Sequence, residues 1–181
     1  MEANEAHELQ EHAEHGAHDT SMRPVAFTMS LLAVLVAVAT VLGHRTHTEA
    51  VLDQNKATDQ WNEYQAKKIR SYNTALESQL LSVVSVADKD KAAKALKQNA
   101  DHQAKWDQDL DEIQKEARKL EDEVKLDERK ASRFDLGEAL LEIGLVVTSV
   151  TLLTRRRSYW FLGMVFGAAG VISACAAFLV H

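Results

Sequence analysis

Apolar residues in this chain gather into three runs that are nearly free of charge. The runs cover 25–43, 139–154 and 158–180, and the last of them holds 23 residues without a charged side chain. A helix of about 20 mostly apolar residues is long enough to cross the hydrocarbon core of a bilayer. The pattern therefore predicts three transmembrane helices, at 24–43, 136–154 and 158–180.

The middle run contains one charged side chain, Glu142, 13 residues before Arg155. At 1.5 Å per residue these two side chains are about 20 Å apart along a helix. Either the helix slides until Glu142 reaches the far interface while Arg155 extends to its own interface, or the acid faces a protein interior or a water path. Glu138 lies one turn before Glu142, and the two acids are our candidates for lining an ion pathway.

The stretch 44–135 is hydrophilic and contains neither proline nor glycine, which is typical of long helices. Its second half shows apolar residues at alternating spacings of three and four, with three polar exceptions, and this predicts a coiled coil. The apolar positions are Leu96, Trp106, Leu110, Ile113, Ala117, Leu120, Val124, Ala131 and Phe134, and the exceptions are Asn99, Gln103 and Asp127. The same count reaches Glu138, Leu141 and Leu145, so we expect this helix to continue into the second span.

The first half of this stretch keeps helical spacing, but its phase drifts. Its apolar positions are Ala57, Trp61, Tyr64, Tyr72, Leu76, Leu80 and Val83. Asp88 and Asp90 are of the type that caps helices, so we place a turn near 87–90 and expect folding there to bring Trp61 near Ile113. The predicted fold is all-α, with three transmembrane helices and a long antiparallel coiled-coil hairpin at 44–135 inserted between the first and second spans.

The residues just before this turn carry many apolar side chains and, between 75 and 87, a single charge on Glu77. The apolar side chains are Leu76, Leu80, Leu81, Val83, Val84 and Val86. Two helices cannot bury all of them. The hairpin tip is thus a candidate for self-association or for a protein partner, and the plainer alternative is that a third copy or a helix end covers it.

Small residues recur at spacings of three and four in the first and third apolar runs, a pattern that allows helices in membranes to approach closely. In the first run they are Ala26, Ser30, Ala33 and Ala37, and in the third run they are Gly163, Gly167, Gly170 and Ala174. We expect these two faces to contact each other.

The N-terminal tail, 1–23, has six acids and no base before Arg23, so it is not the cationic start of a cleaved signal peptide. It also contains four histidines, His7, His12, His15 and His18. Histidine beside glutamate can bind a divalent transition metal, although the spacing does not match a zincin helix. The simpler interpretation is an acidic, disordered tail whose histidines titrate near neutral pH.

Net charge and motifs exclude several classes of function. The formal charge is −6 and no stretch concentrates lysine and arginine without interleaved acids, so we expect no nucleic-acid partner. The single cysteine, Cys175, cannot form an intrachain disulfide. No catalytic triad, phosphate-binding loop or Cys/His cluster appears. We therefore expect no enzyme, and no cofactor apart from the candidate metal at the tail.

Three spans would place the tail and the Arg155, Arg156 and Arg157 turn on one side of the membrane, and the hydrophilic arm on the other. The positive-inside rule assigns a short arginine-rich turn to the cytoplasm, which leaves the arm outside. Seven basic residues near the roots of the arm argue for the opposite orientation. Trp160, with its aromatic neighbours Tyr159 and Phe161, suits the interface beside the arginines.

Several strings of residues resemble a known family: EANE at 2–5, KATDQW at 56–61, YQAK at 64–67, FDLGE at 134–138, and the arginines at 155–157. The family is an uncharacterised group of bacterial membrane proteins, domain of unknown function 4337. The resemblance implies a bacterial membrane location and no activity. Three hypotheses for function remain: an oligomeric, membrane-anchored coiled-coil scaffold; a cation channel or transport subunit lined by Glu138 and Glu142; and metal or pH sensing by the tail.

Overall fold

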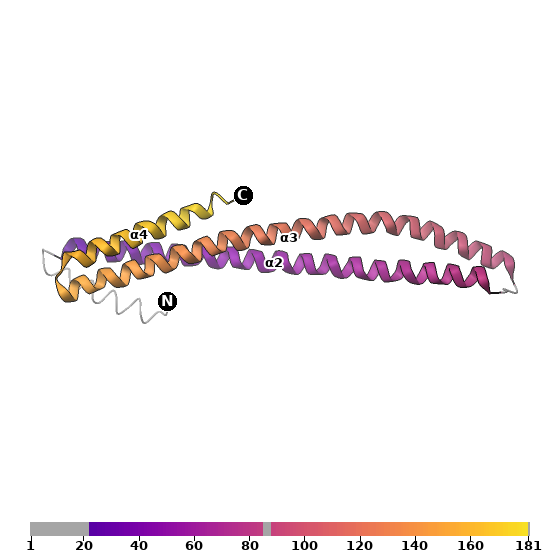
Figure 1. The fold of residues 1–181 in the computed structure, drawn as a ribbon, viewed down its shortest axis with the longest axis horizontal. Helices are drawn as coiled ribbons and strands as arrows, with labels where there is room; N and C mark the ends of the chain where they lie inside the picture. The colour runs from indigo at the N-terminus through magenta and orange to yellow at the C-terminus, as the bar shows by residue number, and fades with distance from the viewer. Residues whose placement is uncertain (1–21, 85–87, 181) are drawn as a thin grey trace. The chain divides into compact units, whose positions relative to one another are not determined.

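The computed structural model describes residues 22–84 and 88–180, and these residues contain three long helices and no strand. The helices are α2 (Arg23–Val83), α3 (Lys89–Thr154) and α4 (Arg157–Ala177) (Figure 1). The predicted all-helical class is confirmed. The four histidines of the tail lie outside the described residues, so the metal hypothesis stays a prediction.

Helices α2 and α3 each join hydrophilic sequence to apolar sequence without a break. Pro24 stands in the first turn of α2, where its missing N–H removes no helical hydrogen bond, and no proline or glycine lies between 44 and 135. The prediction that α3 continues into the second apolar run is confirmed. The expected borders at 43 and 135 therefore fall inside continuous helices.

The chain forms two compact units. We call Met1–Glu49 together with Lys125–His181 the terminal unit, and Ala50–Val124 the central unit. The terminal unit contains the three apolar runs, and the central unit contains most of the hydrophilic arm.

In the central unit, α2 and α3 contact each other through polar pairs. From one pair to the next, the residue number rises on α2 and falls on α3, so the two helices run antiparallel in this unit. The pairs are Trp61 Nε1 donating to Glu121 Oε1 at 2.8 Å, Lys67 Nζ to Asp109 Oδ2 at 3.4 Å, Gln103 Nε2 to the Ser71 carbonyl at 3.4 Å, and Asn99 Nδ2 to Ser78 Oγ at 3.2 Å. Trp61 thus reaches Glu121, eight residues beyond the expected Ile113, since helix side chains lean toward their own N-terminus.

Burial along α3 in the central unit follows the predicted repeat. Every position from Leu96 to Val124 in that repeat is buried or half-buried, including the polar exceptions Asn99 and Gln103. Ala57 on α2 and Ala117 on α3 are both 0% exposed, so large side chains are absent where the packing is closest.

The buried face of α2 changes in composition beyond Tyr64. Ala57, Trp61 and Tyr64 face inward or lie half-buried, whereas Tyr72, Leu76, Leu80 and Val83 are exposed. The exposure of the last three agrees with the prediction that two helices cannot bury all the apolar side chains of the hairpin tip. Beyond Tyr64 the inward positions are mostly polar or small. The buried or half-buried residues there are Lys67, Lys68, Ser71, Thr74, Ala75, Ser78 and Leu81. Ser78 Oγ accepts a hydrogen bond from Asn99 of α3, so this polar side chain fills its position at little desolvation cost. At Ser71 it is the backbone carbonyl oxygen that accepts a hydrogen bond, from Gln103.

The N-terminus of α3 is capped by Asp88. Its Oδ1 accepts a hydrogen bond from the Lys91 backbone N–H at 3.1 Å, and its Oδ2 lies 3.2 Å from Lys91 Nζ. These two interactions stabilise the carboxylate and lower the pKa of Asp88 below its ordinary value, the backbone bond having the larger effect.

This cap predicts a pH dependence of the first turn of α3. Because the pKa is lower in the folded state, the stabilisation is complete above the ordinary pKa of aspartate, near 4, and is lost as the pH falls through the folded value. We expect hydrogen-exchange protection of the amides at 89–92 to fall in Asp88→Ala at neutral pH. Asp88→Asn keeps the acceptor oxygen and should retain most of that protection. Equal loss in both variants would contradict the cap.

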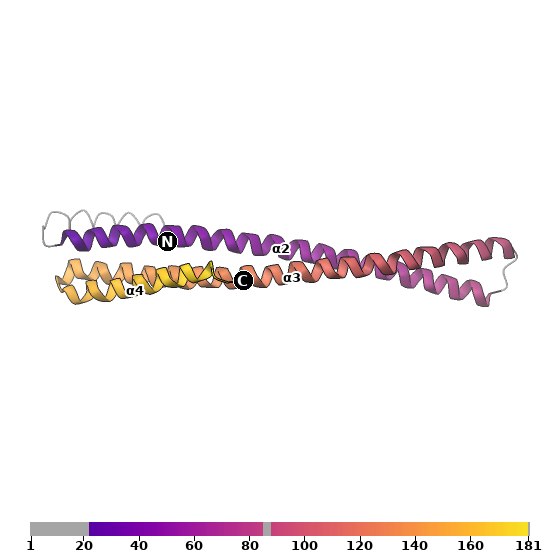
Figure 2. The same ribbon diagram turned by 90° about the horizontal axis from the view of Figure 1, so that it is seen from above.

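In the terminal unit, α4 lies alongside α3 (Figures 1 and 2). A cluster of buried apolar side chains joins α2 to α3. Its members are Met29, Leu32, Val36 and Ala39 from α2, and Leu141 and Leu145 from α3. The positions from Asp127 to Leu145 in the α3 repeat are again all buried or half-buried. On α2 the buried positions from Val25 to Thr46 keep the same alternation of three and four, apart from Ala26, which is buried as well.

Candidate functional site

The closest packing in the terminal unit occurs where glycines of α3 face glycines of α4. A Cβ atom added at Gly144 would lie 2.8 Å from the Gly163 carbonyl oxygen and 3.0 Å from the Gly167 nitrogen. One added at Gly137 would lie 3.0 Å from the Gly170 carbonyl oxygen. Since these neighbours are backbone atoms, only glycine permits this approach, as in membrane helix pairs with small interface residues.

The contact continues beyond the glycines toward the C-terminus of α4. Ser173 Oγ donates to the Arg133 carbonyl oxygen at 3.0 Å. The rings of Phe134 and Phe178 meet edge to face with centroids 5.5 Å apart. Numbers rise on α3 as they fall on α4, so these two helices are antiparallel in this unit.

The small-residue stripe of the third run therefore packs mainly on α3, whereas the sequence led us to expect the first run. Gly163 and Gly170 face α3, and an added Cβ at Gly137 would lie 3.1 Å from Ala174. Only Gly167 also approaches α2, where its added Cβ would meet the Leu32 side chain. On α2, Ser30 and Ala37 are exposed. The apolar side chains of α2 keep its backbone farther from α4, whereas the glycines let the backbones of α3 and α4 approach each other closely.

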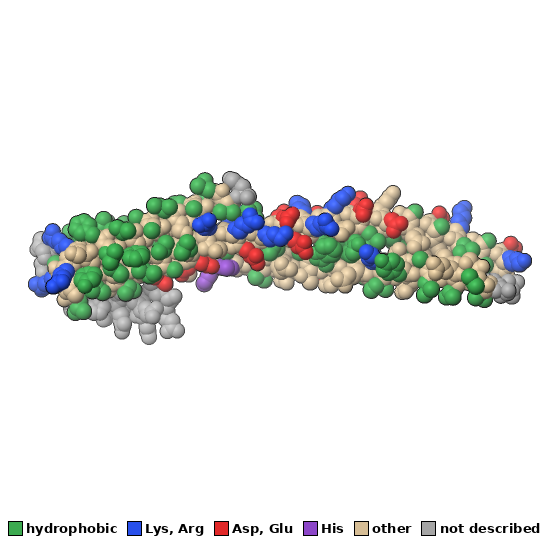
Figure 3. Space-filling view, viewed as in Figure 1, with side chains coloured by type: hydrophobic (Ala, Val, Ile, Leu, Met, Phe, Trp, Pro, Cys, Tyr) green, Lys and Arg blue, Asp and Glu red, His purple; other side chains and the backbone are tan. Residues whose placement is uncertain are grey.

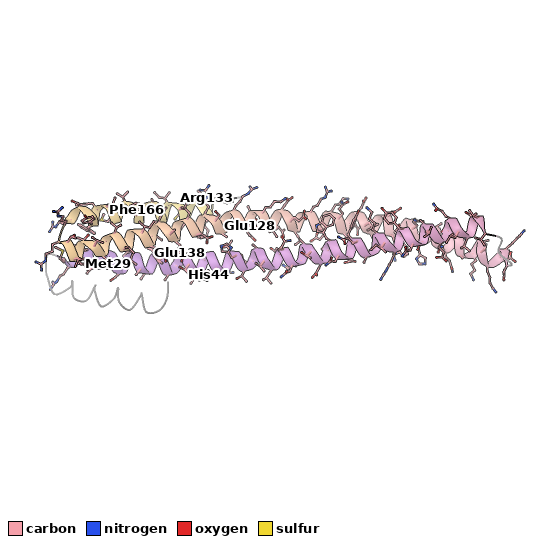
Figure 4. All side chains as sticks on the ribbon, turned by 60° about the horizontal axis from the view of Figure 1, so that its bottom comes forward. Met29, His44, Glu128, Arg133, Glu138 and Phe166 are labelled. Carbon is pink, nitrogen blue, oxygen red and sulfur yellow. The ribbon has the colours of Figure 1, made fainter. Side chains whose placement is uncertain are left out.

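A second face of α3 carries polar side chains that contact α2. Glu138 Oε1 accepts a hydrogen bond from Thr40 Oγ1 at 2.5 Å, and Figure 4 shows Glu138 on α3 beside α2. At one end of this face His47 Nε2 lies 3.0 Å from Asp135 Oδ2. The hydroxyl of Thr40 is thus a partner that the sequence analysis did not identify.

Glu142 continues this face one turn beyond Glu138. Its side chain is half-buried, and among the described residues no hydrogen bond or ion pair involves it. The neighbouring repeat positions, Leu141 and Leu145, are each 1% exposed.

Two threonines of α3, Thr148 and Thr151, are fully buried, with 0% of each residue exposed. Thr148 Oγ1 donates to the Gly144 carbonyl oxygen at 2.7 Å, and a Cβ at Gly163 would collide with that hydroxyl. Thr151 Oγ1 has no hydrogen-bond partner among the described residues. These hydroxyls occupy little volume, which lets the glycine helix approach.

The link between α3 and α4 consists of Arg155 and Arg156, and Arg157 is the first residue of α4. Arg155 has φ 55°, the left-handed conformation that often ends a helix, and its N–H still donates to the Thr151 carbonyl oxygen at 2.8 Å. Arg156 and Arg157 are exposed. Trp160 is half-buried and its Nε1 donates to Thr28 Oγ1 of α2 at 3.1 Å, so it also ties α4 to α2.

Each of the three helices has a segment long and apolar enough to cross a membrane, judged by length and composition. In the space-filling view, hydrophobic side chains cover the visible face of α4 and the adjoining segments, with basic side chains at the α3–α4 link (Figure 3). Exposed apolar side chains of α4 include Phe161, Val165 and Ile172.

Within the described residues, no group of three or more His, Cys, Asp or Glu side chains is arranged to hold a metal ion. The cysteine, Cys175, is exposed on α4.

The sequence analysis missed Gly137 and Gly144, which are the α3 half of the tightest contact. A signal was present, because the two glycines are seven residues apart and Thr148 follows four residues later, which places all three on one helix face. Thr40 carried no comparable signal, since a threonine in an apolar run most often bonds its own helix. Its Oγ1 also lies 3.0 Å from the Val36 carbonyl oxygen, so this oxygen and Glu138 Oε1 share the single hydroxyl hydrogen of Thr40.

Comparison with known proteins gives one match. The family described as a domain of unknown function (DUF4337) matches residues 21–180, which is most of the chain. No curated protein and no solved structure matches the sequence. The matched range takes in all three helices, and the chain belongs to the DUF4337 family.

Proposed function

We propose that this protein is a non-enzymatic, oligomeric scaffold of the bacterial inner membrane. Three transmembrane helices anchor it, and an antiparallel coiled-coil hairpin between the first and second spans serves as a spacer or docking surface. The tail and the arginine link lie in the cytoplasm and the hairpin lies in the periplasm. A short arginine-rich link between two spans supports this orientation.

One observation carries the proposal: the packing repeat of α3 has the same phase in both units. In the central unit the buried or half-buried positions run from Leu96 to Val124, and in the terminal unit they run from Asp127 to Leu145, with no skipped residue. Such a repeat is the signature of coiled-coil packing, and α3 is one helix throughout. The single helix α3 therefore carries both an apolar span and part of the hydrophilic arm.

The proposal is tested first by topology. In a Cys175→Ala background, single cysteines at Gln65 and Ser158 are exposed to a membrane-impermeant maleimide on spheroplasts. We expect Gln65→Cys to react before lysis and Ser158→Cys only after lysis. The reverse pattern would overturn the orientation, and recovery of the protein in the soluble fraction would overturn the membrane anchor.

The mass of the purified complex in lipid nanodiscs tests the oligomer. One chain has a mass of 20.2 kDa. We expect a multiple of this value, and a monomer across the accessible concentration range would overturn the oligomeric scaffold.

A second candidate function is a cation pathway, and the half-buried Glu142 without a described partner is the observation that favours it. In a closed oligomer, copies of Glu138 and Glu142 would supply the acidic rings that cation pathways use. Proteoliposomes containing the full chain should then pass monovalent cations, and Glu142→Gln should abolish the flux. Glu128→Gln, at an exposed position of the same helix, is the matched control and should leave the flux unchanged. Absence of flux through the parent protein would end this candidate.

A further inference from the structure

The central unit has an unusual distribution of polar and apolar side chains on α2. Between Lys67 and Leu81 the inward face is largely polar or small, as described above. The outward face carries the large apolar side chains, with Ile69, Tyr72, Leu76 and Leu80 all more than half exposed and Val83 84% exposed. An amphipathic helix normally buries its apolar face, so α2 presents this face to something other than α3.

The outward side chains form a regular seam. We call Ala66, Ile69, Asn73, Leu76, Leu80 and Val83 the outer stripe, and every member is exposed. Their spacings alternate between three and four, which is the core pattern of a coiled coil. In that repeat Asn73 takes an a position, and a single asparagine at such a position specifies register and the number of strands.

The charges beside the outer stripe fit a parallel pairing with an identical stripe. In a parallel coiled coil each g position approaches an e position of the partner. Here the g positions are Gln65, Tyr72 and Gln79, which are uncharged, and the e positions Arg70 and Glu77 therefore meet no like charge. The nearby Lys67 is already paired with Glu63 and Asp109 of its own chain.

We propose that the outer stripe of α2 binds the outer stripe of a second copy of this chain, in parallel and in register. This inference rests on the proposed membrane anchor. Copies anchored in one membrane have the same orientation. In every copy Ile69 comes 26 residues after Gly43, at the end of the first apolar run, so the stripes start at the same number of residues from the membrane. Anchoring also raises the effective concentration, which lets a seam of under three heptads associate.

The asparagines then form a polar layer in an otherwise apolar contact. Asn73 of each copy can donate to the amide oxygen of the other, as one amide has both donors and an acceptor. A shift of one heptad would place Asn73 against Leu80 or Ala66 and leave its amide unpaired, so the in-register pairing is the favoured one.

Cysteine cross-linking of the full chain in membranes tests the contact. In the Cys175→Ala background, Leu80→Cys should form a disulfide-linked dimer under mild oxidation, because core positions of a parallel pair are adjacent. Ala104→Cys, at an exposed position of α3, is the matched control and should stay monomeric. Failure of Leu80→Cys to link above this control, or linkage only to other proteins, would overturn the proposal.

A second variant separates this inference from the proposed function. Leu76→Asp combined with Leu80→Asp changes two exposed side chains, so its helical content should match the parent while the oligomer mass falls. An oligomeric parent whose double variant keeps the same mass would overturn the outer stripe and leave the scaffold standing. A monomeric parent would overturn both.

Discussion

Gly144→Ala is expected to destabilise the protein even though alanine is the better helix former. The added Cβ would lie within 3.0 Å of backbone atoms of both Gly163 and Gly167, and backbone cannot move aside as a flexible side chain can. Overpacking of this kind costs about 1–3 kcal/mol, which offsets or exceeds the gain of about 1 kcal/mol from helix propensity. Thermal unfolding in detergent, followed by circular dichroism, measures the net effect.

Gly43→Ala is the matched control for this variant. It makes the same chemical change in α2, but its added Cβ would meet only the side chains of Asp135 and Phe134, at 3.4 and 3.5 Å. These are ordinary contact distances, so the helix-propensity gain should remain and the protein should be as stable as the parent or more so. If both alanine variants shift the unfolding temperature equally, the glycine contact between α3 and α4 does not determine stability.

Ala117→Asp is expected to disrupt the central unit. Ala117 is 0% exposed, and the facing region of α2 includes Ala57, which is also fully buried. A carboxylate placed there is shielded from water, and an uncompensated buried charge costs about 3–5 kcal/mol. We expect loss of helical signal at a lower temperature and rapid proteolysis within Ala50–Val124.

The control is the same substitution at Ala104, an exposed position on the same helix. It has the same unfavourable helix propensity but buries no charge, so its effect should be within about 1 kcal/mol. Equal sensitivity of Ala104→Asp and Ala117→Asp to protease would contradict the buried seam.

The predictable part of the fold follows from local patterns. On α3 the apolar positions Ile113, Ala117, Leu120 and Val124 repeat at three and four, and the structure buries all of them. The repeat also identified Asn99 and Gln103 as inward positions, because regular spacing reveals a face even where one residue is polar. On α2 the drifting phase identified no inward face beyond Tyr64, because the inward residues there are mostly polar or small and the conspicuous apolar residues belong to another face. The apolar cluster near the turn did predict that two helices would leave part of it exposed.

The candidate site was predictable in part. Glu138 and Glu142 follow from the phase of the α3 repeat, and the stripe of Gly163, Gly167 and Gly170 follows from its spacing. Their partners could not be predicted, because the spacing of small residues indicates a contact face but does not indicate which helix packs against it. Thr40 became recognisable only when α2 was seen against α3, and the face that contains Gly144 gave no sign that α4 would be its partner.

The sequence by itself determined that the chain is helical, where the helices break, and which segments are apolar enough for a membrane. These properties depend on helix propensity and segment length, which are local. The tertiary structure decided which face of each helix is inward. That choice depends on how closely backbones approach and on whether buried polar side chains find hydrogen-bond partners, as Ser78 does in Asn99 of α3. Both conditions belong to pairs of helices, and no single helix contains them.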